Sequence, residues 1–157
     1  MGLLKKILGK ARPQAIDMLV FQFPEETPIP TVPMLNRASL QQSGNEFTII
    51  EDGILVHRSR VFFKSNLLSN FGFSKPLMTI GDCLTDDRYR GKGIYPEVIR
   101  YLGSKFSKER RVYILVAPDN IPSIRGIEKA GFTFLTRLQA YRFLIFYLRK
   151  NDSSSRS

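Results

Sequence analysis

Several residue types are scarce in this 157-residue chain, which has one cysteine (Cys83), one histidine (His57) and no tryptophan. A single cysteine cannot form a disulfide within the chain. One Cys and one His also cannot supply the four ligands of a structural zinc site, so we expect no metal. The low cysteine content favours a reducing, cytoplasmic compartment. No apolar run reaches the roughly 20 residues that span a bilayer, so no membrane-spanning helix is predicted.

Acidic residues are also scarce, with 14 Asp and Glu against 24 Lys and Arg, which gives a formal net charge of +10. The excess lies in two places. Residues 1–12 hold four basic residues and no acid, and residues 88–111 hold eight basic residues and two acids. Such a balance favours an anionic partner: a nucleotide cofactor, a sugar nucleotide, a nucleic acid or an anionic membrane surface.

The first basic cluster, Met1–Arg12, is amphipathic. Leu3, Leu4, Ile7 and Leu8 fall on one helical face, and the lysines lie largely elsewhere. Two interpretations stay open. The segment is either a helix that makes a weak contact with an anionic membrane, which would place the protein at the inner membrane face, or a basic terminus that packs on its own domain.

Length and composition predict one domain over residues 1–150, followed by a polar tail, 151–157, that we expect to be disordered. The hydrophobic content of 43% is sufficient for a packed core. The hydrophobic patterns predict a mixed α/β (α+β) chain, with short helices at Met34–Gln42, after Gly93 and from Asn120 to about Ala130. Loops are expected at Pro24–Pro33 and Ser65–Lys75. The predicted strands are Ile16–Phe23, Glu46–Ile50, Ile54–Lys64, Leu77–Thr85, Arg111–Ala117, Gly131–Thr136 and Leu138–Leu148.

The stretch Asp82–Tyr95 carries the clearest functional signal. An extended segment enters a basic turn that contains Gly91 and Gly93, and an amphipathic helical pattern follows immediately. Glycines allow backbone N–H groups to approach an anion, and the helix N-terminus adds a partial positive charge. The pattern therefore predicts a phosphate site.

Two motifs in this half of the chain resemble the signatures of the GNAT acetyltransferase superfamily. The first is Arg90-Gly-Lys-Gly-Ile94, similar to the acyl-CoA pyrophosphate loop. The second runs from Asn120 through Ser123 to Gly131-Phe132. The resemblance covers about Leu77–Phe134. It implies a mixed, mostly antiparallel sheet with helices on both faces, and a splayed parallel pair formed by Leu77–Thr85 and Arg111–Ala117.

The resemblance also implies an activity and a set of roles. The protein would be an N-acetyltransferase that moves the acetyl group of acetyl-CoA, its co-substrate, to an amine. Backbone N–H groups would hold the pyrophosphate, the strand end would pair with pantetheine, and the Cys83 backbone would lie at the thioester carbonyl. The cofactor-binding residues implied are Leu84, Thr85, Arg90, Gly91, Lys92, Gly93, Ile94, Tyr95, Asn120 and Ser123.

Three positions depart from the superfamily pattern. Tyr95 stands where Gly or Ala is usual, Ile127 where a tyrosine often protonates the leaving thiolate, and Thr79 where a carboxylate is common. The proton chemistry must then come from other groups or from water. His57 and Asp82 are the candidate bases, and Tyr95 and Tyr113 are the candidate acids. A covalent role for the Cys83 thiol is the less favoured alternative.

A His on the preceding strand and a Gly93-Ile-Tyr-Pro96 helix start look similar to acetyltransferases of bacterial surface-polysaccharide clusters. This likeness suggests a small amine acceptor, such as an amino sugar carried on a nucleotide or lipid. Two alternatives remain: a catalytically degenerate CoA-binding module, and a basic nucleic-acid-binding domain. Because most aromatic residues fall in core patterns rather than on a basic surface, no nucleic acid is expected.

Overall fold

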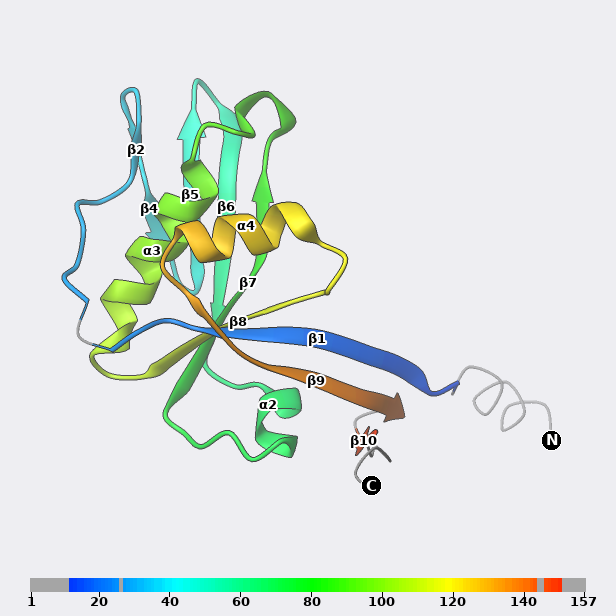
Figure 1. Ribbon diagram of the computed structural model, residues 1–157. Helices are drawn as coiled ribbons and strands as arrows, with labels where there is room; N and C mark the ends of the chain where they lie inside the picture. The colour runs from blue at the N-terminus through cyan, green and yellow to red at the C-terminus, as the bar shows by residue number, and fades with distance from the viewer. Residues whose placement is uncertain (1–11, 26, 144–145, 151–157) are drawn as a thin grey trace.

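The computed structural model describes residues 12–25, 27–143 and 146–150 (Figure 1). Its centre is an eight-stranded sheet in the order β10-β9-β1-β8-β7-β6-β5-β4, beside a two-stranded sheet of β2 and β3. The helices are α2 (Asn66–Asn70), α3 (Ile94–Ser107) and α4 (Ile121–Lys129). The strands are β1 (Gln14–Gln22), β2 (Met34–Leu35), β3 (Ala38–Ser39), β4 (Gln41–Ser43), β5 (Glu46–Glu51), β6 (Ile54–Phe62), β7 (Leu77–Thr85), β8 (Arg111–Val116), β9 (Thr133–Phe143) and β10 (Phe146–Arg149).

Helices cover both faces of the sheet, as predicted. On one face, α3 and α4 bury Val98, Leu102 and Ile127 against strand residues that include Ile80 and Ile114. On the other face, Leu68 of α2 packs with Val20, Leu77, Tyr113 and Leu138. Successive strand residues therefore contribute to different cores, which is why the central strands read as nearly continuous apolar runs.

The parallel strands β7 and β8 separate part-way along their length. They pair from Leu77 with Arg111 to Ile80 with Ile114. Beyond that point β7 continues to Thr85 and β8 to Val116 with no further pairing between them. The predicted splayed parallel pair is thus confirmed, and the end of β7 has an edge that no described strand occupies.

An irregularity on the other side of β7 accompanies this separation. The register between β6 and β7 shifts between Arg58 and Arg60, opposite Gly81 and Leu84. Within the extra length of β7, Asp82 has a positive φ of 48°. This arrangement is a β-bulge, which bends the strand and re-aims its side chains.

The N-terminal strand β1 lies between β8 and β9 and is antiparallel to both. Its pairing with β9 runs from Gln14 opposite Arg142 to Gln22 opposite Thr133. Both strands extend beyond the part of the sheet that α3 and α4 cover (Figure 1). The beginning of the described chain therefore lies beside the end of β9.

The strands predicted at Glu46–Ile50 and Ile54–Lys64 form a hairpin around Asp52-Gly53. Asp52 and Gly53 have φ values of 49° and 77°, and they join β5 to β6. Positive φ at both central residues is the type I′ geometry that suits the twist of a hairpin, and Asp-Gly adopts it readily. Leu77–Thr85 forms a strand with the predicted bounds.

Three local predictions were wrong. Met34–Gln42 is not a helix but two short strands and the start of β4, because Asn36 adopts a positive φ of 51° and turns the chain back. Ser65–Lys75 is not wholly a loop, since the Ser65 side chain caps α2 by accepting a hydrogen bond from the Leu68 N–H at 3.2 Å. The two predicted final strands are instead one continuous strand, β9, and a second short strand, β10.

The predictions for the amphipathic segment Met1–Arg12 and for the tail 151–157 concern residues that lie, apart from Arg12, outside the described ranges. Among the residues that are described, no helix is long and apolar enough to cross a membrane. The same residues contain no group of three or more His, Cys, Asp or Glu side chains that could hold a metal ion.

Candidate functional site

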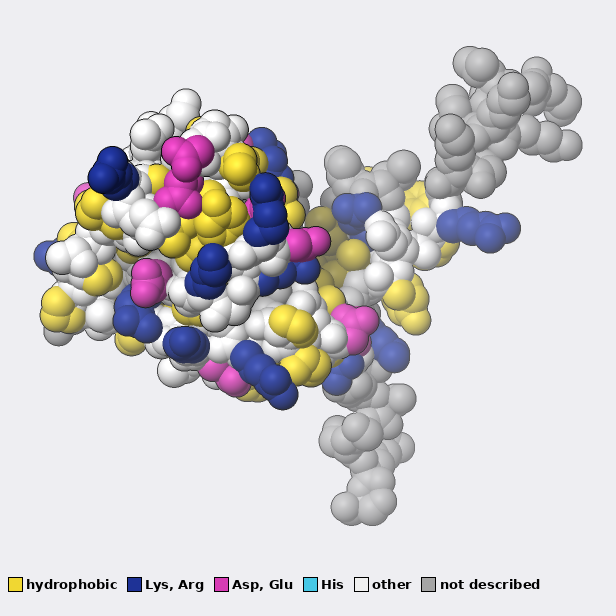
Figure 2. All heavy atoms as spheres, turned by 90° about the horizontal axis from the view of Figure 1, so that it is seen from above, with side chains coloured by type: hydrophobic (Ala, Val, Ile, Leu, Met, Phe, Trp, Pro, Cys, Tyr) yellow, Lys and Arg dark blue, Asp and Glu magenta, His cyan; other side chains and the backbone are white. Residues whose placement is uncertain are grey.

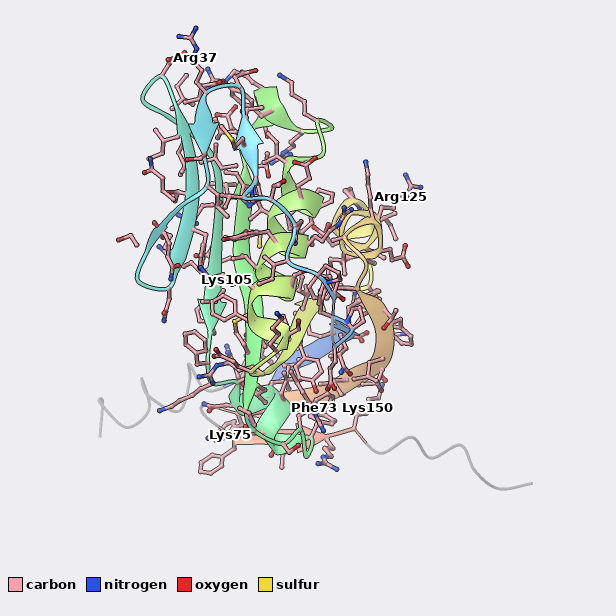
Figure 3. All side chains as sticks on the ribbon, turned by 90° about the vertical axis from the view of Figure 1, so that its left-hand side faces the viewer. Arg37, Phe73, Lys75, Lys105, Arg125 and Lys150 are labelled. Carbon is pink, nitrogen blue, oxygen red and sulfur yellow. The ribbon has the colours of Figure 1, made fainter. Side chains whose placement is uncertain are left out.

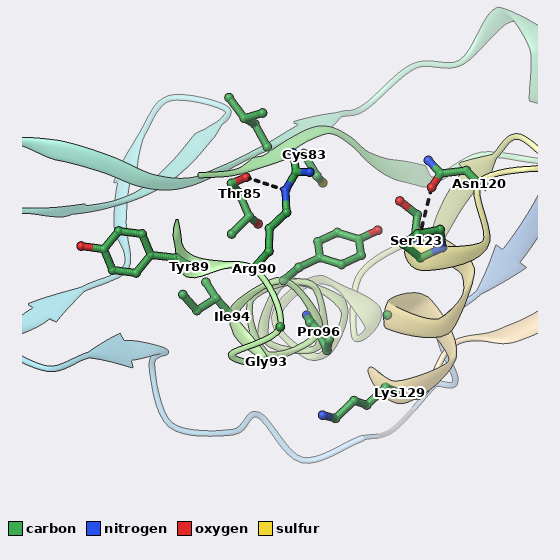
Figure 4. Close-up of a pocket in the computed structure, with 15 residues that line it drawn as sticks. Cys83, Thr85, Tyr89, Arg90, Gly93, Ile94, Pro96, Asn120, Ser123 and Lys129 are labelled. Carbon is green, nitrogen blue, oxygen red and sulfur yellow. Dashed lines mark hydrogen bonds between the residues drawn. The ribbon is translucent and has the colours of Figure 1, made fainter. Parts of the chain in front are cut away.

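A cavity of about 580 Å³ opens where β7 leaves β8 (Figure 4). Four segments form its wall: the end of β7, the glycine turn, the first residues of α3 and one side of α4 with its N-cap residue. Apolar and polar residues both contribute to the surface, including three glycines and two prolines. The lining residues are Cys83, Leu84, Thr85, Tyr89, Arg90, Gly91, Gly93, Ile94, Tyr95, Pro96, Asn120, Pro122, Ser123, Gly126 and Lys129.

The glycine turn presents backbone donors to this cavity. Gly91 and Gly93 have φ values of 77° and 81°, and Gly93 is the N-cap of α3. No acceptor within the described part of the chain is found for the N–H groups of residues 91–95. A run of unpaired N–H groups at the start of a helix is a binding site for an anion such as a phosphate.

Side-chain contacts hold the turn in place. Arg90 donates from Nε to the Thr85 carbonyl at 3.2 Å, and its guanidinium pairs with Asp87 at 2.9 Å (Figure 4). The Tyr89 hydroxyl donates to Glu51 at 3.0 Å. Lys92 does not line the cavity, because its Nζ lies 4.8 Å from the centre of the Tyr89 ring. The predicted backbone role of Lys92 is unaffected by where its side chain lies.

Basic side chains surround this end of the molecule. Viewed from above, Lys and Arg side chains lie around an apolar area, with carboxylates among them (Figure 2). Lys129 lines the cavity and has no ion-pair partner among the described residues. Arg88, in contrast, is paired with Asp86 at 2.9 Å. Lys129 is therefore available to an anionic ligand.

Asn120 and Ser123 lie at the start of α4 and face the same cavity. The Asn120 Oδ1 accepts a hydrogen bond from the Ser123 N–H at 3.3 Å, which caps the helix (Figure 4). The cap uses only the carbonyl oxygen of the amide. Its NH₂ group remains as a donor for a ligand.

His57 does not reach the cavity. Its side chain is fully buried on β6, with Nδ1 2.8 Å from Thr85 Oγ1 and Nε2 2.8 Å from Ser59 Oγ. Burial lowers the pKa of His57 to about 4. The imidazole is consequently neutral at pH 7 and lies behind two polar side chains. The predicted candidate base is therefore not among the residues that line the cavity, and Thr85 lies between the imidazole and the cavity.

The hydrogen bonds around His57 have one consistent direction. Ser59 donates its hydroxyl proton to the Cys83 sulfur at 3.2 Å. Ser59 must then accept at its oxygen, which assigns the imidazole proton to Nε2 and makes Nδ1 an acceptor for the Thr85 hydroxyl. These hydrogen bonds connect Thr85 through His57 and Ser59 to Cys83, and Thr85 and Cys83 both line the cavity.

The Cys83 side chain is poorly suited to nucleophilic attack. Burial raises the pKa of its thiol to about 11. The reactive form of cysteine is the thiolate, so at pH 7 almost none of the reactive species is present. The covalent alternative therefore has no support. Cys83 itself lines the cavity, and its predicted backbone role does not depend on the thiol.

Asp82 lies away from the cavity. Its carboxylate pairs with Arg58 at 3.1 Å and with Arg60 at 2.7 Å, both on β6. Alternate residues of a strand point to opposite faces, so these arginines project from the face opposite His57 and Ser59. The bulge turns Asp82 towards them. The predicted catalytic carboxylate is therefore a surface ion-pair residue in this structure.

Tyr95 is the one candidate acid that lines the cavity. Its ring is half-buried, burial raises its pKa, and no hydrogen bond from its hydroxyl is found within the described residues. Tyr113 is only 2% exposed and packs in the other core, 5.3 Å from the Phe73 ring centre. Ile127 is buried completely. Tyr113 thus lies away from the cavity, and Tyr95 is the predicted candidate acid that lines it. Tyr89 also lines the cavity, but its hydroxyl already donates to Glu51.

Five lining residues were not predicted, namely Tyr89, Pro96, Pro122, Gly126 and Lys129. A signal for one of them was present in the sequence. Gly126 follows Ser123 at an interval of three, which places both residues on one face of α4. The face that carries the predicted Ser123 therefore also carries Gly126.

Comparison with known proteins gives a likeness in structure alone. No family model matches the sequence, and no curated protein matches it. A GNAT-family protein from Novosphingobium aromaticivorans DSM 12444 aligns with a TM-score of 0.60 and 14% identity over 82% of this chain. A GNAT-family acetyltransferase from Colwellia psychrerythraea aligns with a TM-score of 0.59 and 15% identity over 90% of this chain. A GCN5-related N-acetyltransferase from Sphaerobacter thermophilus aligns with a TM-score of 0.58 and 14% identity over 99% of this chain.

These alignments confirm the predicted GNAT fold. At this level of identity they establish the fold and not the reaction. This chain also spans only 64%, 62% and 59% of the lengths of those three proteins. Activity and substrates must be argued from the residues of the site itself.

Proposed function

We propose that this chain, which has the GNAT fold, transfers an acetyl group from acetyl-CoA to an amine. One observation carries the proposal. Unpaired N–H groups of a glycine turn and the free edge of a diverging strand line the same cavity. The first suits a pyrophosphate, and the second suits an amide-containing arm that pairs with backbone.

The residues present fit acetyl-CoA along its length. The turn at residues 91–95 would hold the pyrophosphate, and Arg90 and Lys129 would supply positive charge beside it. The edge of β7 at Leu84 and Thr85 would pair with the pantetheine amides, with the Asn120 NH₂ as a further donor. The thioester would then lie near Cys83, where a backbone N–H would stabilise the developing oxyanion.

The proposed reaction is direct transfer. The amine nitrogen attacks the thioester carbonyl carbon, the carbon–sulfur bond breaks, and the CoA thiolate takes up a proton. Tyr95 would donate that proton, because its raised pKa keeps the phenol protonated at neutral pH. The amine loses its proton to solvent, because no His, Asp or Glu side chain lines the cavity within the described residues.

His57 would act as a positioning residue. Its hydrogen bonds hold the Thr85 side chain directly and the Cys83 side chain through Ser59. Both held side chains belong to residues that line the cavity, beside the bulge in β7. A neutral buried imidazole with both nitrogens hydrogen-bonded suits that task. We further propose an amino sugar on a nucleotide or lipid as the acceptor, which the net charge of +10 would attract.

Among the described residues no general base lines the cavity, which also favours a second candidate, a CoA-binding module without turnover. Two measurements separate the candidates. Calorimetric titration should show acetyl-CoA binding in both cases. Release of free thiol in the presence of a panel of amino sugars and simple amines should occur only for the enzyme.

A pair of glycine substitutions tests the site. Gly91 and Gly44 both have positive φ values, 77° and 58°, and a Cβ added at either would meet no atom within 4 Å. Their replacement by valine therefore imposes similar backbone strain. Gly91→Val should weaken acetyl-CoA binding at least tenfold, and Gly44→Val should not. Equal affinities for the two variants, or no binding by the unaltered protein, would contradict the proposal.

A further inference from the structure

Residues 87–92 lead from β7 towards α3 and include the first glycine of the turn. Their hydrogen bonds and ion pairs stay, with one exception, within the connection from β7 to α3 or reach only the end of β7. The exception within the described chain is the Tyr89 hydroxyl, which donates to Oε2 of Glu51 at 3.0 Å. Glu51 is the last residue of β5 and does not line the cavity. The placement of the turn therefore depends on a side chain outside the site.

The second oxygen of the Glu51 carboxylate is also occupied. Oε1 accepts a hydrogen bond from Nδ2 of Asn36 at 2.6 Å. Asn36 and Arg37 form the turn between β2 and β3, and Figure 3 shows Arg37 at the opposite end of the molecule from Lys75 and Lys150. In Figure 1 this hairpin tip, the β5–β6 turn and the β7–α3 connection lie at the same end. One carboxylate thus joins three segments that are far apart in sequence.

Tyr89 connects this carboxylate to the turn. Tyr89 lines the cavity, and Nζ of Lys92 lies 4.8 Å from the centre of its ring. Lys92 stands between Gly91 and Gly93, which both have positive φ values. Glycine adopts many backbone conformations with similar ease, so a turn that contains two glycines must be held by contacts with its surroundings. The contact of Tyr89 with Glu51 is of this kind.

The charge of Glu51 has the wrong sign for a residue that attracts the ligand. A carboxylate repels a pyrophosphate, so on charge alone its presence near the turn would lower the affinity for an anion. Its hydrogen bonds have the opposite effect, because they restrict the turn before any ligand arrives. Charge and position therefore predict affinity changes of opposite sign when Glu51 is replaced by a neutral residue.

We propose that Glu51 is a positioning residue for the glycine turn. By holding Tyr89, it keeps the turn in the conformation that presents the N–H groups of residues 91–95 to the cavity. The inference rests on the proposed function, since it takes the pyrophosphate of acetyl-CoA as the ligand of those groups. When only a fraction of the free protein has the binding conformation, the apparent affinity falls by that fraction. Loss of the Glu51 carboxylate should therefore weaken ligands that contain the pyrophosphate.

Calorimetric titration of the full chain with acetyl-CoA tests the inference. Glu51→Ala removes both hydrogen bonds and should weaken binding about tenfold. Glu51→Gln should lose only about threefold, because its amide oxygen can still accept from Tyr89. The matched control is Asp52→Asn, which removes the same charge from the adjacent, exposed residue. Asp52 has no ion-pair partner among the described residues, so this variant should bind as tightly as the unaltered protein or more tightly.

The partner of Glu51 gives a reciprocal test. Tyr89→Phe removes the hydroxyl and keeps the ring, so it should weaken acetyl-CoA binding about as much as Glu51→Ala. Both changes break the same hydrogen bond, so the double variant should bind at most about twofold more weakly than Glu51→Ala. S-acetylpantetheine, which lacks the pyrophosphate, supplies the ligand control. Its affinity, measured by NMR titration, should be the same for all variants.

The outcomes separate this inference from the proposed function. Equal acetyl-CoA affinities for Glu51→Ala and Asp52→Asn would overturn the inference and leave the proposed function standing. An equal loss of affinity for S-acetylpantetheine would also overturn it, since the effect of Glu51 would then not be confined to the turn. Absence of acetyl-CoA binding by the unaltered protein would overturn the proposed function and this inference with it. Circular dichroism and urea unfolding establish that each variant is folded before titration.

Discussion

The ring of Tyr95 packs directly on the backbone of Gly126. A Cβ atom built at residue 126 would lie 2.7 Å from Cδ1 of Tyr95, closer than real Cβ atoms approach other heavy atoms. The contact joins the first turn of α3 to the middle of α4 across the cavity. Gly126 immediately precedes Ile127, so a phenol from α3 reaches the helix on which the superfamily pattern has its tyrosine.

Gly126→Ala should therefore disturb the proposed acid more than the cofactor site. The added methyl group must displace the Tyr95 ring, because the helix backbone at residue 126 cannot move freely. We expect kcat to fall roughly tenfold, whereas the KM for acetyl-CoA should change less than threefold. Steady-state thiol release measures both. An equal loss in kcat and in acetyl-CoA affinity would mean that the contact supports binding rather than proton transfer.

Tyr95→Phe removes the hydroxyl while keeping the ring on Gly126. If Tyr95 protonates the thiolate, kcat should fall by about 10²-fold, within the usual range for general acid catalysis. Because the pKa of Tyr95 is raised, the wild-type kcat should show no loss up to about pH 10. Tyr141→Phe, at an exposed position of β9, is the matched control. Unchanged turnover in Tyr95→Phe would assign the proton to solvent.

Local pattern accounts for the parts of the site that the sequence predicted correctly. Three elements are determined by residues close to one another in sequence: strand β7, the Gly91–Gly93 turn and the Asn120 cap. The residue types in each of them are compatible with few other local structures. Helix periodicity alone would also have placed Gly126 beside Ser123. Fold recognition succeeded because these local signals occur at a characteristic separation.

The predicted roles of His57 and Asp82 depended on which face of the sheet each side chain occupies. His57 is buried behind Thr85 and Asp82 turns to Arg60 because of a register shift and a bulge between β6 and β7. A register change by one residue reverses the face of every side chain, and no local pattern reports it. The position of β1 between β8 and β9 is likewise a long-range pairing that composition does not encode.

The buried His57 should make the protein sensitive to acid. Its pKa is about 4 in the folded state and near its ordinary 6.5 when unfolded. Between these values the unfolded chain binds the additional proton, so the free energy of unfolding decreases as the pH falls from 6.5 towards 4. This pKa shift corresponds to a decrease of at most about 3 kcal/mol in the free energy of unfolding.

Urea denaturation between pH 4 and pH 7.5 measures this effect. His57→Gln replaces the imidazole with a polar group that does not titrate, so it should be less stable at pH 7 but should lose less stability on acidification. Parallel pH profiles for the two proteins would show that His57 does not govern the acid response, and the carboxylates paired with arginine would then be the alternative source.

Two adjacent residues of α3, Gly103 and Ser104, allow a test of how tightly this helix packs on the sheet. A Cβ at Gly103 would lie 2.6 Å from Cδ2 of Phe23, whose side chain is only 2% exposed. The aromatic ring is held on its other side by Phe132, with ring centres 4.9 Å apart. Gly103→Ala should thus cost about 1–3 kcal/mol of stability through overpacking, despite the higher helix propensity of alanine.

The adjacent Ser104 supplies the control, because its hydroxyl is buried and has no hydrogen-bond partner among the described residues. Ser104→Ala removes that unpaired group and improves helix propensity, so it should be neutral or stabilising. Thermal and urea unfolding of both variants gives the comparison. If Gly103→Ala is as stable as Ser104→Ala, Phe23 can move aside, and α3 is packed less closely on the sheet than the 2.6 Å approach implies.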